Sequence, residues 1–379
     1  MNSMQPSLSD CHQETRILVL QGGGALGAYQ AGVYEALAAA GEAPEWLAGI
    51  SIGAINAALI AGNPPERRSE RLRDFWQTVT ATSTLLPPPL VTTPGLRRLF
   101  NEFSATLGIF FGLPGFFSPR SLRSWWHDQK PSFYDTAPLR ATLERLIDFD
   151  LLNSGKLRLS VGAVNVRSGN FAYFDTARQR LDARHIMASG ALPPGFPPIE
   201  IDGEWYWDGG LVSNTPLQYV LDQPSKTCRL VFQVDLFPAE GALPHDLVEA
   251  AEREKDIRFS SRTRLNTSYA FAQRSLAQAA HRLAKKLPPE WAQDQDLQSL
   301  LAASPEPAVT VVHLIHRRMR YETQSKDYEF SRLSMQERWQ AGIDDITHTL
   351  NAPEWKNRTP PEDGYQVFDL LPHAQQSKR

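Results

Sequence analysis

The chain has 379 residues, of which 42% are hydrophobic, 21% charged and 10% aromatic, and its formal net charge is −3. These proportions are typical of a globular protein that buries a substantial core, and they exclude a chain that is disordered throughout. The mild acidity, with a pI near 6.3, excludes a strongly basic surface, so we expect no nucleic-acid partner.

The apolar pattern predicts neither a secretory signal nor a membrane span. The first 16 residues are polar, so we expect a disordered N-terminal tail over 1–16. The most apolar window, 107–117, is broken by Gly and Pro and is shorter than the roughly 20 residues that cross a bilayer. Cys11 and Cys228 are far apart, which argues against a disulfide framework or a zinc site and favours a reducing compartment. We expect a cytoplasmic protein that can associate peripherally with a membrane.

Two strand–turn–helix units open the chain. An apolar run at 17–20 is followed by a glycine-rich turn and by Ala and Leu at helical spacing. A second run ends near Ala48, a turn follows at 49–53, and a helix of small residues ends near Gly62. Consecutive units of this kind favour an α/β fold with a mostly parallel central sheet between two layers of helices.

The rest of the chain divides into three further stretches. Residues 80–138 are rich in Pro, Gly, Phe and Trp, which predicts an irregular cap or lid insertion. Regular strand and helix patterns then return and end with a buried parallel strand at 229–238. We expect 17–238 to form the catalytic domain and 239–379 to be a C-terminal helical extension packed on the core, with a strand at 308–315 between its helices.

The first glycine-rich turn admits two interpretations. Gly22, Gly24 and Gly27 fit the G-x-G-x-x-G pattern of a dinucleotide site. Such a site also needs an acidic residue at the end of the second strand, about 20 positions further on, to hold the ribose. Glu42 has roughly that spacing but precedes the second strand. A nucleotide-binding protein therefore stays an alternative to an enzyme of another class.

The turn after the second strand reads GISIG, from Gly49 to Gly53. It matches G-x-S-x-G, the nucleophile elbow that exposes a serine oxygen above the sheet. Ser51 would then lie at a helix N-terminus, where unpaired N–H groups favour a developing negative charge. Gly22, Gly23 and Gly24 would let backbone amides approach that charge as an oxyanion hole. The alternative is two tight turns whose glycines serve packing alone.

A nucleophilic serine needs a base. An α/β-hydrolase would use a late histidine, but each candidate is better interpreted as a surface or core residue: His245, His281, His313 and His316. Asp208 lies in WYWDGG, where Trp205, Tyr206 and Trp207 could desolvate its carboxyl and raise the pKa toward a useful value. Gly209 and Gly210 would let this turn pass close to the serine, although Asp-Gly is also a common turn pair.

The motifs GGGALG, GISIG and DGG, in this order, resemble the patatin-like family of lipid acyl hydrolases over roughly 17–236. The passage ASGALPPGFPP before Asp208 strengthens the resemblance. It implies that Ser51 is the nucleophile, that Asp208 is the general base, and that amides around Gly22, Gly23 and Gly24 form the oxyanion hole. The supporting motif positions are Gly27, Gly49, Gly53, Gly209 and Gly210. The resemblance implies no metal and no cofactor.

The expected function is thus a serine esterase or lipid acyl hydrolase of the patatin-like phospholipase A type, acting on a lipid or other acyl ester through an acyl-enzyme. The family often has Arg or Lys just before the last glycine of the first motif, where this chain has Leu26. The absence of this cation weakens the case for phospholipids as the preferred substrates. Acyl transfer to another alcohol, a catalytically idle lipid-binding protein and a homo-oligomer stay open.

The insertion suggests a membrane contact. Its apolar residues 107–117, with Trp125 and Trp126 after them, would line the acyl pocket and touch a membrane. Four arginines are near in sequence and would meet anionic headgroups, although a plain solvated face fits them better: Arg67, Arg68, Arg97 and Arg98.

Overall fold

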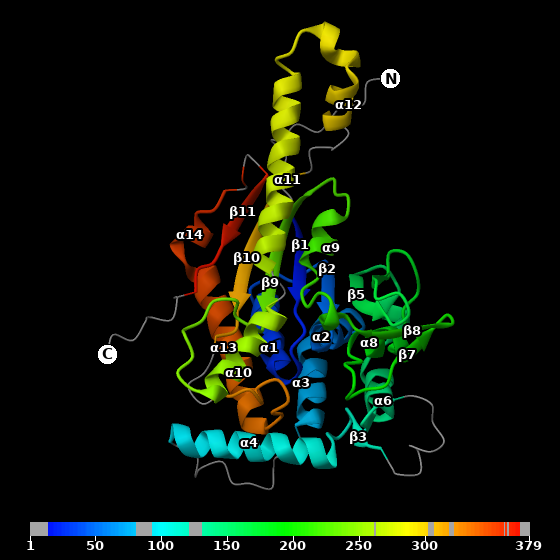
Figure 1. The fold of residues 1–379 in the computed structure, drawn as a ribbon, viewed down its shortest axis with the longest axis vertical. Coiled ribbons are helices and arrows are strands. Elements are labelled where there is room, and N and C mark those ends of the chain that lie inside the picture. The colour runs from blue at the N-terminus through cyan, green and yellow to red at the C-terminus, as the bar shows by residue number, and fades with distance from the viewer. Residues whose placement is uncertain are drawn as a thin grey trace.

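The computed structural model describes residues 14–80, 93–120, 131–260, 263–301, 307–317, 322–359, 361 and 364–371. Its centre is a nine-stranded sheet in the order β11-β10-β9-β1-β2-β5-β8-β7, with β6 also paired to β5 (Figure 1). The strands of this sheet are β1 (Glu14–Leu20), β2 (Trp46–Ile50), β5 (Arg158–Asn165), β6 (Phe171–Asp175), β7 (Ile199–Ile201), β8 (Glu204–Asp208), β9 (Cys228–Asp235), β10 (Val309–Ile315) and β11 (Tyr365–Phe368).

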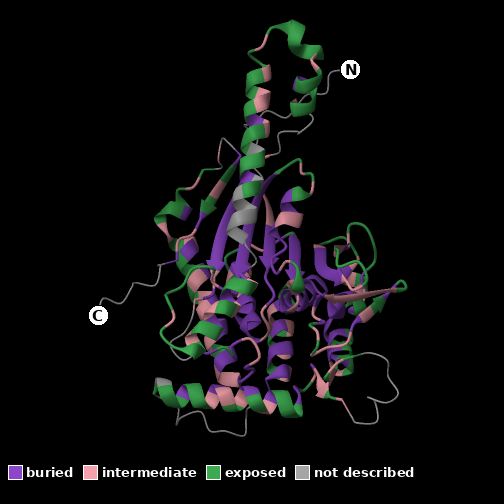
Figure 2. Ribbon diagram, in the orientation of Figure 1, coloured by how far each residue is buried: buried purple, intermediate pink, exposed green. Residues whose placement is uncertain are grey.

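The sheet is parallel from β11 through β10, β9, β1 and β2 to β5, whereas β6, β7 and β8 pair antiparallel. Every residue of β2 and β9 is buried, which explains why the sequence of β2, WLAGI, is apolar throughout rather than alternating (Figure 2). The predicted α/β class with a mostly parallel sheet is confirmed.

Helices cover both faces of the sheet. Leu18 and Leu20 of β1 face one core, which includes α1 (Gly27–Ala39), α2 (Ile52–Ala61), α3 (Arg68–Val79) and α13 (Arg332–Asn351). Ile17 and Val19 face the other, which includes α9 (Leu217–Asp222) and α11 (Thr263–Ala284). The period of two along a strand produces this division. The remaining helices are α4 (Pro94–Phe111), α6 (Ala137–Leu146), α7 (Phe149–Leu152), α8 (Ala183–Ser189), α10 (Leu247–Phe259), α12 (Gln295–Leu301) and α14 (Pro353–Lys356).

The C-terminal part of the chain is more than a helical extension. β10 pairs with β9 along its whole length and β11 continues the sheet beyond it. α13 packs so closely on α1 that a Cβ on Gly32 would lie 1.9 Å from the carbonyl oxygen of Trp339. The upper part of α11 and α12 extend beyond the sheet (Figure 1). The strand predicted at 308–315 is confirmed as β10, and it joins the buried edge of β9.

The insertion at 80–138 is partly regular, which differs from the irregular cap predicted. Its described part contains the 18-residue helix α4, which crosses the lower end of the molecule, and a two-stranded ribbon of β3 (Ser118–Pro119) and β4 (Tyr134–Asp135) (Figure 1). Trp125 and Trp126 lie outside the described residues, as does the predicted tail except for 14–16, which belong to β1.

Two observations concern the cellular setting. Among the described helices, none combines the length and apolarity that crossing a bilayer requires. Cys228 is disulfide-bonded, so the prediction against disulfides is wrong at this position, and Cys11 lies outside the described residues. Disulfides are typical of oxidising compartments, so a cytoplasmic location stays a prediction.

Candidate active site

Strand register brings the serine and aspartate turns together. Ile50, the last residue of β2, pairs with Gly162 of β5, and the next residue of β5, Ala163, pairs with Asp208 at the end of β8. Ser51 and Asp208 therefore lie on either side of β5, at the edge where the parallel strands end. Ligand sites of open α/β sheets form at this edge.

The backbone of Ser51 is strained. Its φ of 55° and ψ of −124° lie in a region that non-glycine residues rarely adopt, as expected at a nucleophile elbow. The turn can be this sharp because glycines flank it: a Cβ on Gly49 would lie 2.4 Å from the carbonyl oxygen of Gly53, and one on Gly53 would lie 2.3 Å from that of Leu20. Ser51 ends up as the N-cap of α2, with its side chain at the positive end of the helix dipole.

Ser189, at the end of α8, fixes the serine turn from outside. The backbone N–H of Ser51 donates to its Oγ at 2.9 Å, and that Oγ donates to the carbonyl of Gly162 at 2.6 Å. Ser189 is fully buried, so both bonds are shielded from water. Sequence reasoning quoted the passage around Ser189 as part of the family resemblance but gave the residue no role.

Asp208 is a buried carboxyl that meets the serine. It lies close enough to the Ser51 hydroxyl for that group to lower its pKa, and its Oδ1 accepts a hydrogen bond from the N–H of Gly210 at 2.7 Å. Burial raises its pKa to about 7, against the opposing effect of these two donors. The aromatic residues before it, 205–207, are each only partly buried. The carboxyl is therefore desolvated by its buried position at the end of β8, and not by these rings alone.

The glycine-rich loop lies against the serine. A Cβ on Gly22 would lie 3.0 Å from that of Ser51 and 2.3 Å from Oδ1 of Asn214. Asn214 also binds this glycine through its backbone, because the Gly22 N–H donates to the Asn214 carbonyl at 3.1 Å and the Asn214 Nδ2 donates back to the Gly22 carbonyl at 2.9 Å. The N–H of Gly22 is thus engaged, which leaves Gly23 and Gly24 as the candidate oxyanion donors.

The other predicted residues lie where packing explains them. A Cβ on Gly27 would lie 2.6 Å from Ile52, and one on Gly209 would lie 2.8 Å from the carbonyl of Gly162. His316 lies 3.4 Å from Glu322, and both side chains are buried.

Glu42, the acid considered for a ribose, instead pairs with Arg16 of β1 at 2.6 Å. Arg16 lies four residues before the end of this strand, where the glycines begin. The pair therefore lies away from the glycine loop. This removes the feature that a dinucleotide site would need.

Comparison with known families agrees with this geometry. A family model described as patatin-like phospholipase matches residues 18–221, and a second, described as patatin phospholipase, matches residues 257–362. Since the first match spans more than half of the chain, the protein belongs to the patatin-like phospholipase family.

Individual relatives are distant. The cGAMP-activated phospholipase of Vibrio cholerae serotype O1 is 24% identical over 230 residues, which are 56% of this chain and 58% of that protein, so the chain spans less than two thirds of its relative. Among solved structures, VipD from Legionella pneumophila is 14% identical, with 89% of this chain and 67% of that one covered and a TM-score of 0.38. Human GIVD cytosolic phospholipase A2 is 13% identical, with 88% and 60% covered and a TM-score of 0.36.

Proposed function

We propose that the protein is a lipid acyl hydrolase in which Ser51 and Asp208 form a catalytic dyad. The observation that carries the proposal is that strand register places the strained serine beside a buried carboxyl, whose pKa is about 7 and is lowered by the serine hydroxyl. A base with this pKa is substantially ionised at neutral pH yet still basic enough to take the serine proton as the oxygen attacks.

The reaction proceeds in two halves. The Ser51 oxygen attacks the ester carbonyl carbon while its proton moves to Asp208, and the tetrahedral intermediate collapses as that proton passes to the departing alcohol. Water then attacks the acyl-enzyme, gives its proton to Asp208, and releases the fatty acid as the proton returns to Ser51. The N–H groups of Gly23 and Gly24 would stabilise both oxyanions, each such donor being worth roughly 2.7 to 4 kcal/mol in related reactions.

Lipid esters are the proposed substrates, in keeping with the family. The family often has Arg or Lys at the position of Leu26, and this leucine is fully buried in the core. The position therefore supplies no cation for a phosphate group. Phosphate recognition would have to come from another residue, and the headgroup preference is therefore a separate matter from ester hydrolysis. A product analysis on a lipid panel would also separate hydrolysis from acyl transfer.

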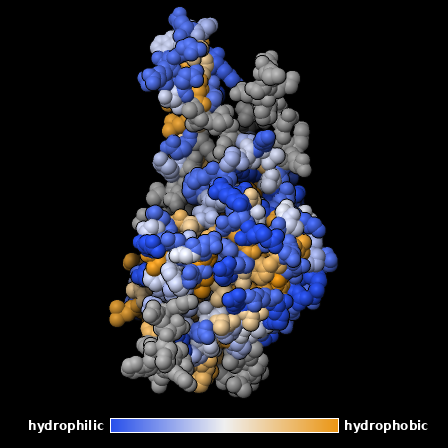
Figure 3. Space-filling view, turned by 90° about the vertical axis from the view of Figure 1, so that its right-hand side faces the viewer, coloured by the Kyte–Doolittle hydropathy of each residue, from blue (hydrophilic) through white to orange (hydrophobic). Residues whose placement is uncertain are grey.

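The outer face of α4 is the proposed membrane contact. Six large apolar side chains of this helix are between 45% and 72% exposed: Leu96, Leu99, Phe103, Ile109, Phe110 and Phe111. Apolar side chains are also visible at the lower tip of the molecule in Figure 3, the end at which Figure 1 places α4. The single acid of α4, Glu102, binds Ser325 instead of facing outward. Such a face suits a helix that lies in a membrane surface.

Two of the four candidate arginines do not fit a headgroup role. Arg68 is buried and donates to the carbonyl of Asn63, and Arg97 is buried against Ser334 and Glu337. Both side chains stabilise the packing of their helices. The apolar residues of α4 are therefore the main element of the proposed contact.

Replacement of either dyad member tests the function. Ser51→Ala and Asp208→Asn should each lower turnover of p-nitrophenyl butyrate by about 10⁴-fold or more while the protein stays folded. A fluorophosphonate probe should label wild-type Ser51 and leave Ser51→Ala unlabelled. Normal turnover by either variant would refute the dyad, and absence of labelling would favour an idle lipid-binding protein. Calorimetry with NAD and ATP should show no binding.

The membrane contact has its own test. Phe103→Ser combined with Phe110→Ser should weaken sedimentation with phospholipid vesicles by about tenfold and lower hydrolysis of vesicle lipid, because these rings would no longer enter the membrane surface. Turnover of a soluble short-chain ester should not change. Leu276→Ser combined with Leu283→Ser on α11, where the side chains are 64% and 55% exposed, is the matched control. Equal vesicle binding by the α4 and α11 double variants would refute a role for α4 in the membrane contact.

A further inference from the structure

The far end of the glycine loop, residues 21–25, is held by a segment more than 300 residues away in the chain. The N–H of Ala25 donates to the backbone carbonyl of Asp327 at 2.7 Å. Gly24, with φ of 54°, lies so close that a Cβ there would be 2.0 Å from the same oxygen. We name residues 322–331 the strap. The strap thus lies directly against the two residues that follow Gly23.

The near end of the loop is held by α10. The carbonyl of Phe259, the last residue of this helix, accepts from Nε2 of Gln21 at 3.2 Å and from Nδ2 of Asn214 at 2.9 Å. Asn214 in turn holds Gly22 through two hydrogen bonds. The orientation of the loop therefore depends on two elements outside it, α10 at one end and the strap at the other.

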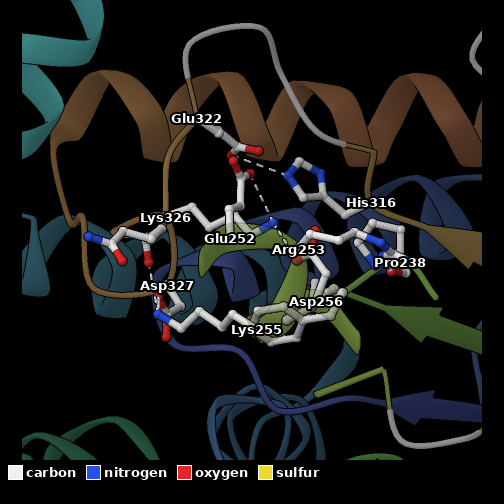
Figure 4. A network of polar contacts seen from close by, with 12 residues as sticks. Pro238, Glu252, Arg253, Lys255, Asp256, His316, Glu322, Lys326 and Asp327 are labelled. Atoms are coloured by element: carbon white, nitrogen blue, oxygen red, sulfur yellow. Dashed lines mark hydrogen bonds and ion pairs between the residues drawn. The ribbon is translucent and has the colours of Figure 1, made fainter. Parts of the chain in front are cut away.

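A buried lysine joins these two elements (Figure 4). Nζ of Lys326, in the strap, lies 2.5 Å from Oδ1 of Asp256 and 3.4 Å from Oε1 of Glu252, both on one face of α10. The side chains of Lys326 and Glu252 are each only 2% exposed. Burial raises the pKa of Asp256, and Lys326 opposes that rise. Charges buried to this degree are held in place by their partners, because separation would leave one of them unpaired.

The strap has further anchors around this lysine. Glu322, at its start, lies 3.4 Å from His316 and 3.3 Å from Arg338 of α13. Burial alone would raise the pKa of Glu322, but His316 and Arg338 hold it well below its usual range. Ser325 donates to Glu102 of α4 at 2.9 Å. The strap is thus a fixed element between the outer helix and the glycine loop.

We propose that Lys326 is a positioning residue for the reaction at Ser51, because it joins the strap to α10 and so fixes the amides of Gly23 and Gly24. The proposal rests on the proposed ester hydrolysis. Glycines lose more conformational freedom on folding than other residues, so a loop of three cannot fix its own amides. Oxyanion stabilisation needs donors that are in place before the reaction, which makes an external support part of the catalytic requirement.

Lys326→Met is the test, with two readouts. Lys255 of α10 also pairs with Asp327, but its side chain is 19% exposed, so this link is the weaker one. Loss of the buried Lys326 link should therefore raise hydrogen exchange at the Ala25 amide by about tenfold or more, since its acceptor becomes mobile. It should also lower kcat for a soluble ester by about tenfold or more at nearly unchanged KM, because misplaced donors act on the transition state rather than on binding. Lys326→Arg should restore most of both. Arg358→Met, which breaks a pair with Glu14 at the start of β1, is the control for general destabilisation.

Each result decides the proposal. Unchanged exchange at Ala25, or raised exchange with unchanged kcat, would overturn it, as would an equal fall of kcat in Arg358→Met. If the wild type hydrolysed no ester, the proposed catalytic dyad would be refuted. Hydrogen exchange at the Ala25 amide would still show whether Lys326 holds the glycine loop. If Lys326→Met did not fold, Glu252→Gln removes one partner and leaves Asp256 in place. It should raise Ala25 exchange by about threefold, and no increase would refute the link.

Discussion

The serine turn, residues 49–53, and the glycine loop, residues 21–25, lie against each other but are supported differently. The serine turn is fixed by backbone contacts with its own strand, by the helix that follows it and by Ser189. The glycine loop is fixed by side chains and carbonyls from far along the chain, such as Phe259, which is 238 residues from Gln21. Apart from Ser189, which is 138 residues from Ser51, the support of the serine turn is thus local in sequence, whereas that of the glycine loop is not.

The difference has a physical basis. A nucleophile elbow needs a strained backbone, and a short strand and helix on either side can impose it. An oxyanion hole needs bare amides, so its residues have no side chains with which to pack. The support must then come from neighbouring elements, here α10 and the strap. Substitutions in the two regions should therefore have separable effects.

Gly24→Ala should have the largest effect on the glycine loop. The new Cβ would meet the Asp327 carbonyl at 2.0 Å, at a φ of 54° that alanine rarely adopts, so the loop must move. Displacement of one oxyanion donor predicts a fall in kcat of about 100-fold or more in an ester assay. Gly41→Ala is the matched control, since its φ is 77° and a Cβ there would meet nothing within 4 Å. Similar kcat values for the two variants would show that the contact of residue 24 with the strap does not position the oxyanion donors.

The pH dependence should report the serine side of the site. Asp208 acts as a base only when ionised, and its pKa is about 7. Activity is therefore lost as the pH falls through 7, so kcat/KM for a neutral soluble ester should drop by about tenfold per pH unit below this value and level off above it. Lys326→Met should lower the plateau without moving its midpoint. A profile that stays flat from pH 5 to 8 in folded protein would contradict the assignment of Asp208 as the base.

The sequence predicted what is local and missed what is distant. The strand–turn–helix units and the turns that carry Ser51 and Asp208 could be predicted because each motif carries its own turn chemistry. The strap could not, since Lys326 in QSKDYE looks like any solvated lysine until the fold places it beside Glu252 and Asp256. The same limit applies to α4, because the Pro, Gly, Phe and Trp residues of 80–138 predict an irregular cap and give no sign of an 18-residue helix within it.

Ser189→Ala should have the smallest effect, and it tests how far the serine turn depends on support from outside. The substitution leaves the buried N–H of Ser51 without its acceptor, which should cost roughly 1 to 3 kcal/mol of unfolding free energy. It should also lower kcat by about threefold to tenfold, since Ser51 must hold a φ of 55° against relaxation. Ser160→Ala is the matched control, because this serine is equally buried on β5 but bonds Trp46 and Asp175 instead. If both variants lost the same stability but kcat fell only in Ser189→Ala, the serine turn, too, would depend on a distant contact. Equal kcat values would mean that its own strand and helix suffice.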